Sequence, residues 1–145
     1  MADAPHILII EARFYADIAD ELARGAIAAL NRAGATHERV AVPGALEIPP
    51  VLAMAIAGPR HYDGYVLLGC VIRGETGHYD IVANQSARAV MDLATEHRLA
   101  VGYGILTVEN DDQARERARV DRLDKGGVAA GAALAMVALQ AQFKS

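Results

Sequence analysis

Short runs of consecutive apolar residues alternate along this chain with segments in which apolar residues recur at every third or fourth position. Unbroken runs of this kind are typical of strands buried on both faces, and the longer period is typical of amphipathic helices. Strands are expected at residues 6–10, 37–42, 62–71 and 99–108. Helices are expected at residues 17–33, 48–57 and 79–97, then after Asn110 and after Asp124.

Local signals support several of these boundaries. Gly34 stands where a helix C′ glycine is expected, Pro49 and Pro50 suit a first helical turn, and Asn110 with Gln113 resembles a capping box. Asp124 is the expected N-cap of the last helix. Because strands alternate with helices, we expect a parallel sheet covered on both faces. The predicted fold is α/β, a flavodoxin-like three-layer sandwich with a four-stranded parallel sheet, formed by residues 1–145 as one domain.

Composition narrows the class of protein. A net charge of -4 argues against a nucleic-acid partner, and the single cysteine, Cys70, allows no intrachain disulfide and suits a reducing cytoplasm. Residues 1–6 do not show the pattern of a signal peptide. The apolar stretch 126–143 is rich in alanine and interrupted by glycine, so it is expected to be a buried helix, with a subunit contact as an option, rather than a membrane span.

Ligands of open parallel sheets bind at the carboxyl ends of the strands. That rule directs attention to residues 13–15, 43–47, 70–78 and 103–110. In the third of these segments, Gly74 and Gly77 allow a tight turn before a helix, whose free N–H groups favour an anion such as phosphate. The alternative is a turn that only connects strand to helix. The segment does not match the P-loop pattern, so hydrolysis of a nucleoside triphosphate is not expected.

Several side chains near these ends have both a chemical and a structural interpretation. His78 begins a helix, whose positive end keeps an imidazole neutral and able to accept a proton, although many such histidines are structural. Phe14 can stack on a planar heterocycle or plug the edge of the sheet. Glu47 can bind a polyol or stabilise a helix dipole. Arg117 belongs to an arginine-rich helix face, and Lys125 opens the last helix; each is either solvated or an anion ligand.

Taken together, these segments resemble the lumazine synthase family. The matching segments keep their order and cover nearly the whole chain. They are Arg13-Phe14, Pro-Gly-Ala-Leu-Glu-Ile-Pro at 43–49, Gly-Cys-Val-Ile-Arg-Gly-Glu-Thr-Gly-His-Tyr-Asp at 69–80, Gly-Ile-Leu-Thr-Val-Glu-Asn at 104–110, and Lys125-Gly126. The resemblance implies condensation of 5-amino-6-(D-ribitylamino)uracil with 3,4-dihydroxy-2-butanone 4-phosphate to 6,7-dimethyl-8-ribityllumazine, with no cofactor and no metal. The residues agree, because no dense cluster of His, Cys and carboxylates is present.

The resemblance also implies a role for individual residues. Phe14 is expected to stack on the pyrimidine ring, and His78 to transfer protons. Backbone contacts to the pyrimidine are expected from Val71 and Ile72, contacts to the ribityl chain from Gly44, Ala45, Leu46 and Glu47, and contacts to phosphate from Arg73, Gly74, Glu75 and Thr76. The adjacent subunit is expected to supply Tyr103, Arg117 and Lys125. The implied active site therefore lies between subunits of a homopentamer.

Three positions depart from the family pattern. Tyr15 stands where many members have Asn, Gly77 where many have Thr or Pro, and Tyr103 where Phe is frequent. A flavin or lumazine carrier without turnover is the main alternative, although a carrier has no need of His78, Arg117 and Lys125. A response-regulator receiver is excluded, because Glu11-Ala12-Arg13 and Cys70-Val71 stand where its acidic residues belong. A free pentamer, paired pentamers and an icosahedral shell all remain open.

Overall fold

The computed structural model describes residues 4–144, so Met1, Ala2 and Asp3 of the segment examined for a signal peptide lie outside it, as does Ser145. In chain order the elements are β1 (His6–Ala12), α1 (Ala16–Arg32), β2 (Thr36–Val42), η1 (Ala45–Glu47), α2 (Ile48–Ala57), β3 (Gly64–Ile72), α3 (His78–His97), β4 (Val101–Val108), α4 (Asp111–Ala118) and α5 (Lys125–Lys144). The predicted strands and helices are confirmed, with ends that differ by one or two residues.

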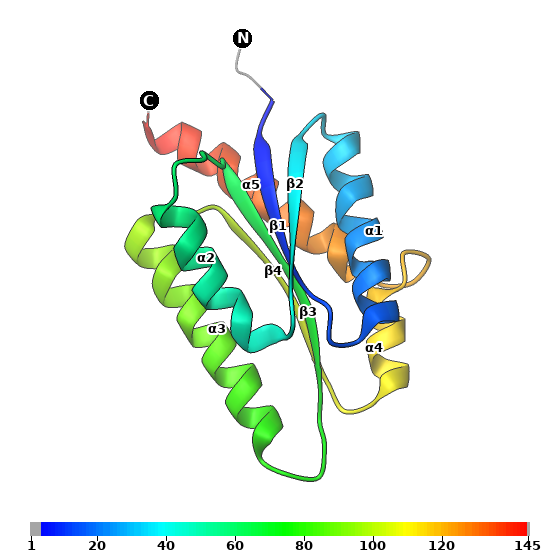
Figure 1. The fold of residues 1–145 in the computed structure, drawn as a ribbon. Helices are drawn as coiled ribbons and strands as arrows, with labels where there is room; N and C mark the ends of the chain where they lie inside the picture. The colour runs from blue at the N-terminus through cyan, green and yellow to red at the C-terminus, as the bar shows by residue number, and fades with distance from the viewer. Residues whose placement is uncertain (1–3, 145) are drawn as a thin grey trace.

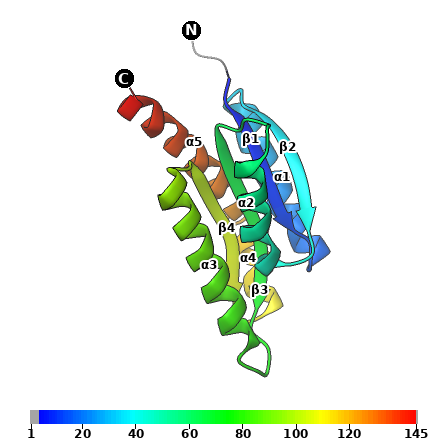
Figure 2. The same ribbon diagram turned by 60° about the vertical axis from the view of Figure 1, so that its left-hand side comes forward.

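The four strands form one parallel sheet in the order β2-β1-β3-β4. Helices α1, α4 and α5 cover one face, where their apolar residues pack on Ile7 and Ile9 of β1. Helices α2 and α3 cover the other face and pack on Leu8 and Ile10 (Figures 1 and 2). Because successive residues of β1 point to opposite faces and nearly all are apolar, the strand is buried on both sides. The predicted flavodoxin-like three-layer sandwich is therefore confirmed.

Most of the predicted helix caps and boundary residues are confirmed. Gly34 has a left-handed φ of +76°, and the two prolines lie in the first turn of α2. The backbone N–H of Gln113 donates to the side chain of Asn110 at 2.8 Å, but the Gln113 side chain accepts from Glu109 instead of completing a capping box at Asn110. Asp124 caps α5 by accepting from the backbone N–H of Gly127, with a φ of +46°.

Helix α5 differs from its prediction as a buried helix. Only one stripe is buried, consisting of Gly126, Ala129, Ala130 and Ala133, and this stripe packs on α1, β3 and β4. The other side exposes Met136, Leu139 and Phe143. Among residues 4–144, α5 is the helix long and apolar enough to span a membrane, a test that core helices of soluble proteins also pass. The exposed side of α5 is an apolar surface that no element among residues 4–144 covers.

Candidate active site

The carboxyl edge of the sheet brings the predicted segments together. β1 lies between β2 and β3, so the chain leaves β1 toward one neighbour and returns to the sheet on its other side. Such a reversal opens a crevice above the ends of the two central strands. The turn at Phe14 follows β1, and the loop from Arg73 to Gly77 follows β3. Figure 1 shows this edge at the bottom, where the loop after β3 leads into α3 and the loop after β4 into α4.

Phe14 stands at the tip of a short turn between β1 and α1. Its side chain is 73% exposed, and its ring meets that of Tyr15 edge-on with the centroids 4.9 Å apart. Tyr15 turns inward instead and packs on the core under α1. Burial raises the pKa of Tyr15, and its hydroxyl bonds the backbone of Ile72 at the end of β3. Phe14 therefore presents a free aromatic face above the sheet and does not plug its edge.

Arg13 is engaged within the chain. Its guanidinium donates to Glu11 Oε1 at 2.9 Å and to the carboxylate of Asp20 in α1. These two ion pairs engage the Arg13 guanidinium within the chain. Sequence reasoning did not single out Glu11, which is 2% exposed. The available signal was a carboxylate at the end of the apolar run His-Ile-Leu-Ile-Ile.

The segment after β2 folds into the short 3-10 helix η1. Ala45 is buried beneath it, while Leu46 and Glu47 are exposed. Gly44 is extended, with a φ of -149°, and a Cβ there would lie 3.2 Å from Glu47 Oε1. The Glu47 carboxylate therefore lies next to the Gly44 backbone. Because Glu47 is the N-cap residue of α2, its carboxylate is also close to the positive end of that helix. A carboxylate and exposed backbone side by side suit a ligand with hydroxyl groups.

The loop after β3 exposes backbone N–H groups. Val71 is buried and Ile72 half-buried, whereas Gly74, Glu75 and Thr76 are exposed. Helix α3 begins at His78, whose backbone N–H donates to Thr76 Oγ1 at 3.3 Å. The amides of Gly74, Glu75 and Thr76 make no hydrogen bond with any described residue of the chain. Unpaired amides at the start of a 20-residue helix favour an anion.

Arg73 crosses from this loop to the end of β4. Its Nε lies 2.9 Å from the Glu109 carboxylate and its Nη1 lies 3.5 Å from Asp80, while the guanidinium lies 4.1 Å from the centroid of Tyr79. The hydrogen bond to Glu109 is the main cause of the raised pKa of Arg73. A phosphate at the loop would compete with two carboxylates for this cation. The loop therefore needs a further cation to bind a dianion well.

Helix α4 and the turn after it carry several arginines, which differ in their partners. Arg115 pairs with Asp111 at 2.6 Å, Arg119 pairs with Asp121 at 2.8 Å, and Arg122 lies 3.9 Å from Glu116. Arg117 has no carboxylate partner among residues 4–144 and donates only to the backbone oxygen of Gln113, at 3.1 Å. Its guanidinium is therefore the one in this group whose charge is not already neutralised.

Tyr103 and Lys125 do not join Phe14 within one chain. Tyr103 lies in the middle of edge strand β4, level with Leu67, and its hydroxyl faces Ser86 of α3. Lys125 starts α5 on the opposite face of the sheet, where Gly126 packs against the backbone of Leu22. Tyr103 and Lys125 therefore lie apart from Phe14 and also from each other, on the two faces of the sheet.

Cys70 is unsuited to nucleophilic chemistry. Burial, aided by the nearby Asp111 carboxylate, raises the pKa of its thiol to about 12. We expect no alkylation by iodoacetamide at pH 8 until the protein is unfolded in urea, with mass spectrometry as the readout. Between its ordinary value of 9.0 and about 12, the folded thiol keeps a proton that the unfolded chain loses. The free energy of unfolding should therefore fall as pH rises through that window, and rapid labelling of the folded protein would contradict this account.

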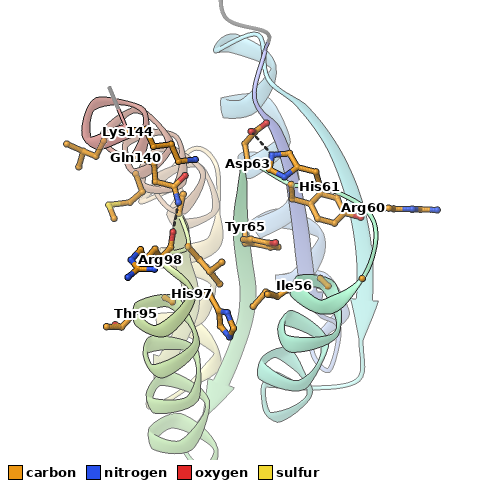
Figure 3. A pocket seen from close by; sticks show the side chains of 18 of the residues that line it. Ile56, Arg60, His61, Asp63, Tyr65, Thr95, His97, Arg98, Gln140 and Lys144 are labelled. Carbon is orange, nitrogen blue, oxygen red and sulfur yellow. Dashed lines mark hydrogen bonds and ion pairs between the residues drawn. The ribbon is translucent and has the colours of Figure 1, made fainter.

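A groove of about 1190 Å³ lies at the opposite, amino edge of the sheet (Figure 3). Its walls combine apolar side chains such as Ile56 and Tyr65 with Arg98 and Lys144. The predicted site residues do not line it. No group of three or more potential metal ligands is found among residues 4–144.

The chain is similar to known proteins over nearly its whole length. The sequence model of 6,7-dimethyl-8-ribityllumazine synthase matches residues 4–141. The chain is 58% identical to the synthase of Bartonella tribocorum over 143 residues, which cover 99% of this chain and 95% of the relative. It is 62% identical to synthase 1 of Rhizobium meliloti over 139 residues, with 93% and 91% covered, and 59% identical to the Agrobacterium fabrum synthase over 140 residues, with 94% and 95% covered. The chain therefore belongs to the lumazine synthase family.

Proposed function

We propose that this chain condenses 5-amino-6-(D-ribitylamino)uracil with 3,4-dihydroxy-2-butanone 4-phosphate. The products are 6,7-dimethyl-8-ribityllumazine, phosphate and water. An amine of the uracil condenses with the ketone with loss of one water, phosphate is eliminated, and the second amine closes the ring with loss of another water. The observation that carries the proposal is the family match over residues 4–141, which includes each of the four segments at the carboxyl edge.

Different residues bind the pyrimidine ring and the ribityl chain of the aminouracil. Phe14 stacks on the pyrimidine, and the backbone of Val71 and Ile72 hydrogen-bonds its edge. The ribityl hydroxyls lie along Gly44, Ala45, Leu46 and Glu47. This assignment is supported by the free aromatic face of Phe14 and by the exposed carboxylate of Glu47 beside Gly44. Holding two substrates in one orientation supplies a large part of the rate.

Phosphate binds at the start of α3. The open amides of Gly74, Glu75 and Thr76 hold it together with Arg73, which must exchange Glu109 for the ligand. Arg117 of the adjacent subunit supplies the second cation, consistent with its lack of a carboxylate partner. His78, exposed at the first position of α3, moves protons between the amine, the carbonyl oxygen and solvent.

The active site forms between subunits of a homopentamer in the cytoplasm, and residues 1–145 constitute one domain. Two observations support the shared site: Tyr103 and Lys125 lie apart from Phe14, and α5 exposes an uncovered apolar side. Sedimentation should give a particle five times the 15.3 kDa chain mass. A monomer with full turnover would refute the shared site.

Replacing His78 with alanine is expected to lower kcat roughly 100-fold without abolishing turnover, because proximity and charge stabilisation remain. Product absorbance and phosphate release measure both rates. His97, at the other end of α3, provides a matched control, and His97→Ala should leave kcat unchanged. An unaltered rate in His78→Ala would remove the proton-transfer role.

The function itself is tested by mixing the purified protein with both substrates. Lumazine and phosphate should appear in equal amounts, well above the uncatalysed background. Tight binding of lumazine without acceleration would instead identify a carrier.

A further inference from the structure

A buried carboxylate stands directly beneath the turn that carries Phe14. Glu11 is 2% exposed near the end of β1. Its Oε1 accepts from Arg13 Nη1 at 2.9 Å and from Arg39 Nη2 at 2.8 Å, and its Oε2 accepts from Arg39 Nε at 2.7 Å. Arg39 lies on edge strand β2, in register with Ile9. Both carboxylate oxygens are thus fully occupied by two guanidinium groups.

An ion pair at this position is expected to stabilise the sheet less than an apolar side chain would. Burying an ion pair costs desolvation that an apolar residue at the same place avoids. The preceding residues of β1, from Ile7 to Ile10, are all apolar and buried. Glu11 thus provides a fixed geometry at a point where simple burial would stabilise the strand equally well.

That geometry extends into the turn through Arg13. The guanidinium held by Glu11 also donates to Asp20, one turn into α1, while the Arg13 backbone N–H donates to Val42 at 2.9 Å. Arg13 therefore ties the end of β1 to β2 and to the first part of α1. Phe14 is the next residue; it is 73% exposed, and its ring meets the ring of Tyr15 in a T-shaped arrangement. With so little packing around it, the ring is placed by the backbone of this turn.

We propose that Glu11 is a positioning residue for substrate recognition: by anchoring Arg13 it fixes the turn that presents Phe14 to the pyrimidine. The inference rests on the proposed stacking role of Phe14. Glu11 does not touch the substrate. Its effect is confined to the ring that stacks, so it acts on one substrate and leaves the phosphate site, on β3 and α3, as it is.

The test compares Glu11→Gln with Glu38→Gln. Glu38 is a matched control, since it pairs with Arg60 at 2.7 Å and His6 at 2.8 Å toward the amino edge, away from the site. Glu11→Gln should raise the KM for the aminouracil about tenfold and leave the KM for the ketone phosphate unchanged. Glu38→Gln should change neither. A merely structural role of Glu11 predicts equal changes in both KM values, or lower stability alone, and either result would overturn the inference.

A double-mutant cycle tests the route through Phe14. In a Phe14→Ala background, Glu11→Gln should have no further effect on the KM for the aminouracil. Additive effects would show that Glu11 acts by another path. Asp20→Asn, at a residue 65% exposed, removes the second anchor of Arg13 without touching the core and should reproduce part of the KM shift. If the unaltered protein lacks turnover, the proposed function fails. If the unaltered protein is active and the variants have the same KM values as it does, the positioning role alone fails.

Discussion

Gly126→Ala will destabilise the protein by about 3 kcal/mol, which makes it among the most damaging single-methyl additions in the chain. A Cβ on Gly126 would lie 2.0 Å from the backbone oxygen of Leu22, so α1 and α5 would have to separate. A backbone oxygen in a helix cannot rotate away as a side chain can. Urea denaturation at a fixed protein concentration measures the change.

Gly131 provides the control within the same helix. No atom of another element lies within 4 Å of the Cβ position, so Gly131→Ala should stabilise α5 by about 0.5–1 kcal/mol. Equal effects of the two substitutions would mean that the close contact with Leu22 has no energetic importance.

Arg117→Ala will reduce kcat/KM for the ketone phosphate by roughly 1000-fold, or about 4 kcal/mol. Arg73 is partly neutralised by Glu109 and Asp80, so removal of Arg117 would leave the proposed phosphate site without a free cation. Arg115→Ala, on the same helix but paired with Asp111, should change kcat/KM little. Steady-state rates with the aminouracil saturating measure both. A loss confined to the KM for the aminouracil would contradict the phosphate role.

Complementation locates the Arg117 contact. Phe14→Ala and Arg117→Ala chains are each impaired alone and should regain activity when co-assembled, because some interfaces then pair an intact Phe14 with an intact Arg117. Arg117→Ala chains assembled only with themselves stay inactive. If mixed particles form and remain inactive, both residues serve a site within one chain.

The sequence predicted the structure well where that structure depends on residues close together in the chain. Gly34, the two prolines of α2 and the Asn110 cap were predicted from local chemistry, and the structure confirms them. The roles assigned to His78, Phe14 and Arg117 came from the family pattern and remain predictions. Their local settings, an exposed helix start, a free ring and an unpaired cation, are compatible with those roles.

Features that depend on strand register were not predictable. The Glu11–Arg39 pair joins residues 28 positions apart. It forms because β1 lies beside β2 in a register that places Arg39 opposite Ile9. The pairing of Arg73 with Glu109, 36 positions away, likewise requires β3 to lie beside β4. Within one chain only a stripe of α5 is buried; because its composition is apolar on all sides, no polar face marked in the sequence which stripe contacts the sheet.

The contact between α1 and α5 also bears on how subunits assemble. α1 begins directly after Phe14, and midway along its length it meets Asp124 and Gly126, which flank Lys125. The contact between α1 and α5 therefore links Phe14 and Lys125 within each chain, although the proposed shared site takes them from different subunits. When two different surfaces of each subunit meet at a constant angle, the subunits close into a ring with one fixed number of members. In the proposed pentamer, the angle at which α1 and α5 cross would help to set the curvature of the ring, so a change in that angle would alter the ring without changing any residue at the interface.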